Sequence, residues 1–362
     1  MKTVTFGEVM ARLAAPGFLR LRQALPGSLE VTFAGAEANV AASLAMLGSE
    51  VSFVTALPRH AMADACLAGL AGLGIDTRHI VRTDAGRLGL YFLEAGANQR
   101  PSQVIYDREM SAISLTEGSA YDWPGIFQGA RWFHTTGITP AISRTAAEAT
   151  IDAARAARAA GVTVSCDLNF RKKLWRWDPS VAPRSLAENT MRRLLPLVDL
   201  LIANEEDCAD VLRIHAGDTN VESGRLAVHR YPEVARQVVT QFPNVRRVAI
   251  TLRESLSASR NNWGAMLYVA DEQRVIVAPR QGESYQPYEI WSIVDRVGSG
   301  DAFAAGLIFA SLTPELADAQ TALEFAVAAS CLAHSVPGDF NYVTRGEVES
   351  LMRGSRSGRV VR

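Results

Sequence analysis

The first feature that bears on the fold is a regular alternation of apolar and helical segments, which begins near residue 131. An apolar segment at 132–138 is followed by an alanine-rich segment of helical spacing at 146–161, and a second apolar segment follows at 162–169. Residues 198–212 repeat the change from an apolar segment to a helix. Such alternation is typical of a parallel sheet covered by helices on both faces. It predicts an α/β fold whose ligands bind beyond the carboxyl ends of the strands.

The second feature is a glycine-interrupted turn at the start of a helix, within residues 295–310 (DRVGSGDAFAAGLIFA). Ile293 and Val294 predict a strand before the turn, and the small residues from Asp301 onward predict a helix. Glycines let a ligand approach the backbone, and the free N–H groups of a helix N-terminus attract an anion such as phosphate. Asp301 then has two open roles: a helix cap, or a carboxylate that takes a proton from an attacking hydroxyl.

Three segments in the N-terminal third do not follow this alternation. Residues 29–33 alternate with period two, and residues 87–93 and 103–106 form a hairpin candidate with a long turn. Two arrangements stay open: a small sheet outside the main one, or edge strands of the main sheet.

Polar stretches in the C-terminal half are expected to be loops. These are an insertion at 213–231, a long polar turn at 254–264, a loop at 279–290 and a frayed basic tail at 354–362.

Charge and composition narrow the function classes. The formal net charge of -1 at pH 7 gives no electrostatic case for binding nucleic acid or an anionic membrane. The four cysteines lack CxxC spacing and predict buried thiols in a reducing compartment. No segment has the length and apolar character of a membrane span or the pattern of a signal peptide, so we expect a cytoplasmic protein. The histidines lack zinc-site spacing, and no P-loop motif occurs.

Polar residues follow each strand of the regular half, at the edge where a site is expected. Arg171, with Lys172 and Lys173, offers cations for a sugar acid or a polyphosphate, or forms a solvated basic turn. The cluster from Asn204 to Asp207 holds Mg²⁺ through water, or supplies acids at a helix N-terminus. Further polar residues in such positions are Asp167, Asn169, Thr251 and Arg253.

Two motifs together carry a family resemblance. The segment VDRVGSGDAFAAG at 294–306 resembles the D-T-x-G-A-G-D anion-hole signature of the PfkB, or ribokinase-like, sugar kinases. The segment GAEANVAASLAMLG at 35–48 resembles their G-G-x-x-x-N-x-A signature. Within the family, further segments resemble 2-keto-3-deoxygluconate kinases: GEVMARL, GLYFLE, VIYDRE, GITPA, CDLNFRKKLW and HSVPGDFN.

The resemblance implies a ribokinase-like three-layer αβα sandwich with a mainly parallel sheet and a small β-sheet lid. It implies one domain over 1–362, with lid segments at approximately 11–34 and 87–108. The implied activity is ATP-dependent phosphorylation of a keto-deoxy sugar acid, 2-keto-3-deoxygluconate to its 6-phosphate, with Mg²⁺ and with a monovalent cation as a further candidate. Alternatives are a kinase for a neutral sugar, fructose or ribose, and a non-catalytic sugar- or nucleotide-binding member of the fold.

The resemblance also assigns roles to residues. Asp301 is the base, assisted by Arg171 and by the anion hole of Gly298, Ser299 and Gly300. Asn204 and Asp207 organise Mg²⁺. The sugar pocket is assigned to Gly35, Asn39, Tyr91, Tyr106, Arg108, Asn169 and Asp339, and the ATP site to Asn204, Thr251, Arg253, Val297, Gly298 and Gly300. For Tyr91 and Tyr106, cross-strand packing in a hairpin is the alternative.

Three positions depart from the family signatures. Arg296 stands where the signature has Thr, Ala34 replaces the first Gly of the N-terminal pair, and Asp207 stands for the Glu of N-x-x-E. The apolar strands of the lid predict a homo-oligomer that pairs through them.

Overall fold

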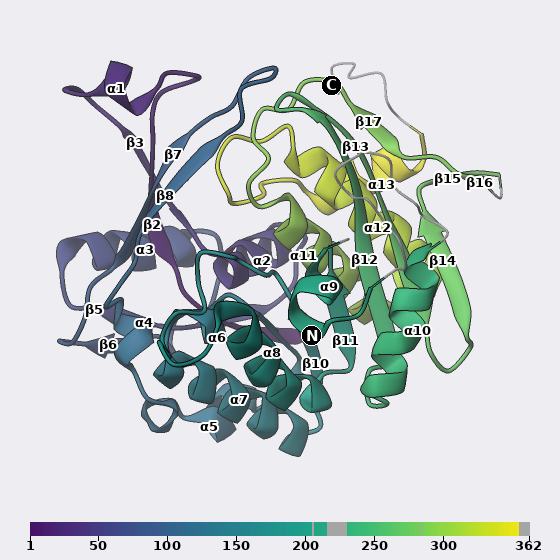
Figure 1. Ribbon diagram of the computed structural model, residues 1–362, viewed down its shortest axis with the longest axis horizontal. Coiled ribbons are helices and arrows are strands. Elements are labelled where there is room, and N and C mark those ends of the chain that lie inside the picture. Colours follow the sequence, from purple (N-terminus) through teal and green to yellow (C-terminus); the bar gives the residue numbers. More distant parts are fainter. Residues whose placement is uncertain (205, 216–229, 283, 355–362) are drawn as a thin grey trace.

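The computed structural model describes residues 1–204, 206–215, 230–282 and 284–354. Within these residues the main sheet has nine strands in the order β14-β13-β12-β11-β10-β9-β1-β4, with β17 paired to β13 (Figure 1). All pairings from β4 to β12 are parallel, and β13 pairs antiparallel with its three neighbours. The strands are β1 (Lys2–Phe6), β4 (Val51–Val54), β9 (Ala130–Thr136), β10 (Thr163–Asp167), β11 (Leu200–Ala203), β12 (Arg247–Ser257), β13 (Arg260–Val269), β14 (Arg274–Ala278) and β17 (Tyr288–Ile290).

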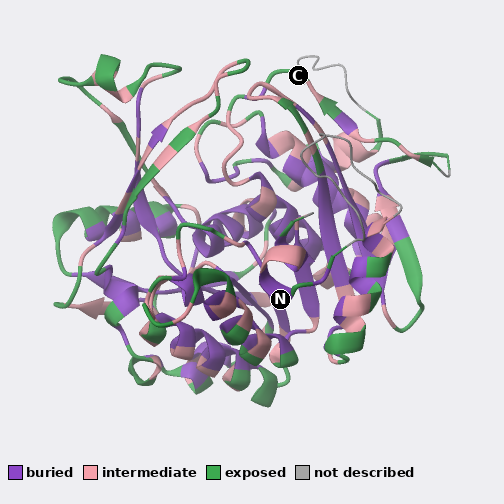
Figure 2. Cartoon of the chain, in the orientation of Figure 1, coloured by how far each residue is buried: buried purple, intermediate pink, exposed green. Residues whose placement is uncertain are grey.

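Helices cover both faces of this sheet, and each face has its own hydrophobic core. One core contains α2 (Ala36–Met46), α3 (Ala61–Gly72), α11 (Ser299–Leu312), α12 (Ala319–Ala333) and α13 (Arg345–Met352). The other contains α5 (Trp123–Phe127), α7 (Arg144–Ala159), α8 (Pro183–Leu194), α9 (Asp207–Leu212) and α10 (Tyr231–Gln241). Figure 2 shows the central strands of the sheet and the inner sides of these helices as buried. The predicted three-layer αβα fold is confirmed.

The shorter elements connect these layers. They are α1 (Leu21–Ala24), α4 (Ala112–Leu115), α6 (Thr139–Ile142), β5 (Ala56–Pro58), β6 (Val81–Thr83), β15 (Arg280–Gln281) and β16 (Ser284–Tyr285), with short 3-10 turns at Gly118–Ala120, Leu195–Leu197 and Pro314–Leu316. No helix in the described ranges is both long enough and apolar enough to cross a membrane.

Helix α11 is buried on nearly all sides, because it packs between α2 and α12. Its small residues allow this close contact: a Cβ atom on Gly306 would lie 2.9 Å from the Cα of Ala326 in α12. A helix that is apolar all round is expected to be buried in this way. The packing fixes the N-terminus of α11 relative to the sheet.

A second sheet stands apart from the first, at the upper left of Figure 1. Its order is β3 (Glu30–Ala34), β2 (Met10–Ala14), β7 (Gly89–Glu94) and β8 (Gln103–Asp107). Its inner side chains, which include Met10, Tyr91 and Leu93, form a small apolar cluster, whereas Val31 and Ile105 are exposed. The outlying segments therefore form a separate small sheet, and the alternative of edge strands in the main sheet is wrong.

Three local predictions are also wrong. Residues 254–264, expected to be a polar turn, continue β12 and begin β13, which pair from Arg247↔Val269 to Ser257↔Arg260. The polar residues of 254–264 lie at the half-exposed end of the β12–β13 hairpin. Polar residues in such a position do not by themselves indicate a turn. The structure has no strand at Ile293 and Val294. The expected loop at 279–290 contains the short strands β15, β16 and β17.

Some sequence predictions fall outside the described residues. These concern Glu205, most of the insertion at 213–231, and the tail beyond Gly354.

Candidate active site

A pocket of about 370 Å³ lies at the carboxyl ends of the parallel strands, and the small sheet forms one of its walls. All residues to which the family resemblance assigns a role line this pocket, although their individual roles stay predictions. They are Gly35, Asn39, Tyr91, Tyr106, Arg108, Asn169, Arg171, Asn204, Asp207, Thr251, Arg253, Val297, Gly298, Ser299, Gly300, Asp301 and Asp339. Lys172 and Lys173 are exposed and do not belong to the lining.

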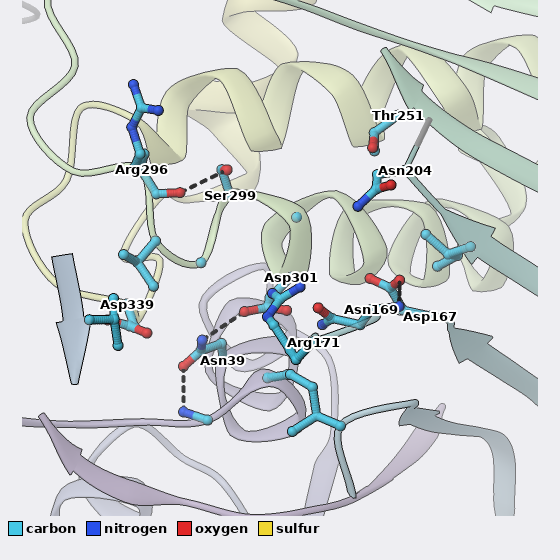
Figure 3. Close-up of a pocket in the computed structure, with 18 of the residues that line it drawn as sticks. Asn39, Asp167, Asn169, Arg171, Asn204, Thr251, Arg296, Ser299, Asp301 and Asp339 are labelled. Atoms are coloured by element: carbon cyan, nitrogen blue, oxygen red, sulfur yellow. Dashed lines mark hydrogen bonds between the residues drawn. The ribbon is translucent and has the colours of Figure 1, made fainter. Parts of the chain in front are cut away.

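Asp301 lies in the first turn of α11, and its side chain faces the pocket (Figure 3). Gly298 is the N-cap of α11 and no side chain caps the helix, so the capping role for Asp301 is wrong. Its Oδ2 accepts a hydrogen bond of 2.7 Å from Nδ2 of Asn39. Burial raises the pKa of Asp301 to about 7, against the lowering effect of the Asn39 hydrogen bond. A carboxylate with a pKa near neutrality is well suited to general base catalysis.

Asn39 is held in position by the start of α2. Its Oδ1 accepts a hydrogen bond of 3.1 Å from the backbone N–H of Gly35, which is the N-cap of this helix. A side chain at Gly35 would overlap the carbonyl oxygen of Glu8, so the close approach of two backbones requires glycine there. This arrangement fixes the Asn39 amide group that faces Asp301.

The residues Gly298–Gly300, which we call the glycine turn, form an open cradle beside Asp301. Gly298 has φ of 84°, and a Cβ atom on it would overlap the carbonyl oxygen of Asp339. A Cβ atom on Gly300 would meet no atom within 4 Å, so free space lies beside the first backbone N–H groups of α11. A helix N-terminus with open space in front of it fits a phosphate group.

Besides Arg108 on the small sheet, three arginines bring positive charge to the pocket. Arg171 lies beside Asp301 in Figure 3. Burial raises the pKa of Asp167, Asp207 and Asp301, whereas the positive charge of Arg171 lowers the pKa of all three. Arg296 donates to the carbonyl oxygens of the turn between β12 and β13, at 3.0 and 2.7 Å. Arg253 lines the same wall. Guanidinium groups in this number fit a polyphosphate.

The acidic cluster after β11 organises its own turn. The two carboxylate oxygens of Asp207 accept backbone N–H groups of Asn204 and Phe170, both at 3.1 Å. The side-chain oxygen of Asn204 accepts the N–H groups of Glu206 and Asp207, at 2.8 and 2.9 Å. These hydrogen bonds define the position of Asn204 and Asp207.

Asp167, at the end of β10, is an acidic residue to which the sequence assigned no role. In the described part of the chain its carboxylate accepts one hydrogen bond, from the N–H of Asn169 at 3.0 Å. Burial raises its pKa, and the nearby charges of Asp207 and Asp301 raise it further. Mg²⁺ binds through one or two carboxylates, substrate phosphates and water, and Asp167 with Asp207 fits that ligand set. The described residues contain no complete cluster of three protein ligands for a metal.

The wall formed by the small sheet carries two tyrosines and an arginine. Tyr91 and Tyr106 lie opposite each other on β7 and β8, with ring centroids 6.1 Å apart, so they form a cross-strand pair and also line the pocket. The hydroxyl of Tyr91 donates to Oδ1 of Asp339 at 2.6 Å. Arg108 pairs with buried Glu8 and lies over the ring of Tyr106. The charge of Arg108 is therefore partly neutralised.

Sequence reasoning missed Glu8, Arg12 and the role of Asp167. Arg12 could have been recognised from the sequence, because a charged residue is unusual in an apolar, buried strand such as MARLA. Glu8 could not have been recognised in this way, because it lies in a loop and its partner Arg108 is 100 residues away in the sequence.

The chain matches the model of the pfkB family carbohydrate kinases over residues 2–242. It belongs to this family. A relative from Haloferax volcanii, named 2-dehydro-3-deoxygalactonokinase, is 33% identical over 357 residues, which cover 98% of either chain. The resemblance seen in the two sequence motifs is thereby confirmed.

Solved structures agree with this membership. The 2-dehydro-3-deoxygluconokinase of Thermotoga maritima is 44% identical, with 98% of both chains covered and a TM-score of 0.86. A fructokinase of Xylella fastidiosa with bound ATP is 24% identical, covers 97% of this chain and 98% of that one, and has a TM-score of 0.72. The second likeness shows the shared fold alone.

Proposed function

We propose that this carbohydrate kinase transfers the γ-phosphoryl group of ATP to a hydroxyl of a keto-deoxy sugar acid. The first candidate is 2-keto-3-deoxygluconate, also called 2-dehydro-3-deoxygluconate, which becomes its 6-phosphate. The galactonate epimer is the second candidate, because one relative carries that name. The observation that carries the proposal is Asp301, a buried carboxylate with a pKa of about 7 beside the open glycine turn.

The chemistry follows from this geometry. A substrate hydroxyl at Asp301 gives its proton to the carboxylate while its oxygen attacks the γ-phosphorus, and ADP leaves. The backbone N–H groups of the glycine turn and the guanidinium of Arg171 stabilise the charge on the transferred phosphoryl group. Asn204, Asp167 and Asp207 would hold Mg²⁺, which when bound offsets charge on the phosphate oxygens.

The remaining pocket residues divide between the two substrates. Arg171 can contact either the sugar carboxylate or a phosphate, since guanidinium suits both. We assign the sugar acid to Gly35, Asn39, Tyr91, Tyr106, Arg108, Asn169 and Asp339. We assign ATP to Asn204, Thr251, Arg253, Val297, Gly298 and Gly300. A monovalent cation has no support beyond the resemblance.

The small sheet serves as a lid of a single kinase domain over 1–362, and its closure would exclude water that competes as acceptor. Its outer face exposes Val31 and Ile105, at 50% and 55%. Exposed apolar strands fit pairing with a second subunit, which supports a homo-oligomer through the lid. A cytoplasmic location rests on the thiols Cys66, Cys166 and Cys208, which are buried outside any disulfide.

An ADP-release assay over a substrate panel tests the proposal. We expect the two keto-deoxy sugar acids to give the highest kcat/KM, with fructose and ribose far behind. Faster turnover of fructose or ribose would favour the neutral-sugar kinase. Sugar binding without ADP release from any substrate would favour the non-catalytic alternative.

Variants of two lid arginines refine the panel. Arg108→Ala should raise KM for the sugar acids more than for the neutral sugars, if its charge helps to bind the carboxylate. Arg87→Ala is the matched control, because Arg87 also belongs to the lid region but pairs with exposed Asp107 at 2.5 Å, outside the pocket.

A further inference from the structure

Arg12 is a buried arginine on strand β2 of the lid, and it lies behind the pocket rather than on its lining. Its guanidinium contacts two carboxylates: Nη1 lies 2.5 Å from Oδ1 of Asp339, and Nη2 pairs with Oδ2 of Asp295. Asp295 precedes α11 and Asp339 follows α12, so neither partner belongs to the lid. One side chain therefore ties the lid to both segments that flank the glycine turn.

The register of the lid adds a second donor to the same group. Arg12 on β2 is paired directly with Tyr91 on β7. The Tyr91 hydroxyl donates to the same Oδ1 of Asp339 at 2.6 Å. Two lid residues side by side thus hold the Asp339 carboxylate, which lines the pocket.

Asp295 in turn holds the backbone that leads into the glycine turn. Its Oδ1 accepts the N–H groups of Arg296 and Val297, at 2.8 and 3.1 Å. Its Oδ2 accepts the N–H of Gly338 at 3.2 Å in addition to the Arg12 guanidinium. With four donors the carboxylate of Asp295 is saturated, and no lone pair is left for a metal ion.

Asp339 is buried and the side chain of Asp295 is 11% exposed, and both lie next to the glycine turn. Such carboxylates require positive charge, because an uncompensated charge removed from water is costly. Arg12 is the guanidinium that contacts both of them. The backbone of Asp339 also packs against Gly298, so a shift of this carboxylate would move the turn.

We propose that Arg12 is a positioning residue that acts as a built-in cation. It neutralises Asp295 and Asp339 and keeps the lid, the sugar pocket and the glycine turn in register, so that the site works without a bound monovalent cation. The activity readout of this proposal rests on the proposed kinase function, whereas the stability readout does not.

The test compares wild type, Arg12→Met and Arg12→Lys in KCl, NaCl and choline chloride at equal ionic strength. For wild type we expect the same kcat and the same melting temperature in all three salts. For Arg12→Met we expect kcat to fall by about tenfold or more and KM for the sugar acid to rise, because Asp339 and the turn lose their common support. K⁺ should then restore part of both turnover and melting temperature relative to choline.

Arg12→Lys keeps the charge but cannot reach both carboxylates with a planar fork. If Arg12→Met fails to fold, Arg12→Lys should still fold, because it keeps the positive charge. We expect Arg12→Lys to have a raised KM for the sugar acid. Arg87→Ala, which breaks an exposed ion pair near the lid hairpin, is the control and should match wild type in every salt.

Two results would overturn the proposal. One is a wild-type enzyme whose turnover or melting temperature is raised specifically by K⁺. The other is wild-type kcat and KM in Arg12→Met or in Arg12→Lys. If wild type phosphorylates no sugar acid, the proposed function fails, and the melting temperatures in the three salts still decide the role of Arg12.

Discussion

Replacing Asp301 by asparagine should stabilise the protein, and the gain should grow with pH. The pKa of Asp301 is raised from 3.8 to about 7 in the folded chain, mainly by burial. A raised carboxyl pKa means that the folded state holds the proton more tightly than the unfolded state. The stabilisation is complete below the unfolded pKa and is lost as pH rises to the folded pKa. Asp301→Asn does not titrate and escapes this loss.

The magnitude follows from the size of the shift. Between pH 5 and pH 8 wild type should lose about 3 kcal/mol of unfolding free energy through this group, at 1.36 kcal/mol per pKa unit. For a chain of 362 residues that corresponds to roughly 4 °C in melting temperature, using the average unfolding entropy per residue. The difference in melting temperature between Asp301→Asn and wild type should therefore widen by that amount from pH 5 to pH 8.

Differential scanning calorimetry at the two pH values measures this directly. Asp107→Asn is the control, because the exposed Arg87 guanidinium lowers the pKa of Asp107, which stays ionised across the window. Its effect should be the same at both pH values. A gap between Asp301→Asn and wild type that does not change with pH would refute the reasoning about burial.

The other predictions concern the neighbours of Asp301. Asn39→Ala removes the hydrogen bond that lowers the pKa of Asp301, so the rising limb of kcat/KM against pH should move to higher pH; an unmoved limb would argue against the contact. Gly298→Ala should cost about 1 kcal/mol or more in urea unfolding, because its φ is positive and its Cβ meets the Asp339 carbonyl. Gly300→Ala should keep wild-type stability but lose turnover, since the new methyl fills the phosphate cradle; full activity there would contradict that placement.

Much of the fold could be predicted because local pattern and global topology agree. The alternation from residue 131 gave β9, α7, β10, β11 and α9 in the right order, each stabilised by burial of the apolar side that the sequence displays. The outer part of the β12–β13 hairpin, at 254–264, could not be recognised, because it is polar on both strands and is held by cross-strand pairing. Strands that are held by backbone pairing of this kind show no alternation of apolar and polar residues in the sequence.

The residues of the site likewise divide into those that the sequence predicts and those that it does not. Short motifs carry Asp301 and the glycine turn, because their function depends on local backbone geometry. The contacts of Asp301 with Asn39, and of Arg12 with Asp295 and Asp339, join residues 262 to 327 positions apart. Such pairs form only when α2, the small sheet and α11 come together in the folded chain. A single sequence does not show which distant polar groups will pair.

The proposed function requires Asp301 to remove the proton from the substrate hydroxyl. Its most direct test is the turnover of Asp301→Asn with saturating ATP and sugar acid, together with calorimetric binding of the sugar acid to the same variant. We predict that kcat falls by about 10²–10⁴-fold while the sugar acid still binds. Turnover close to that of wild type would contradict the account.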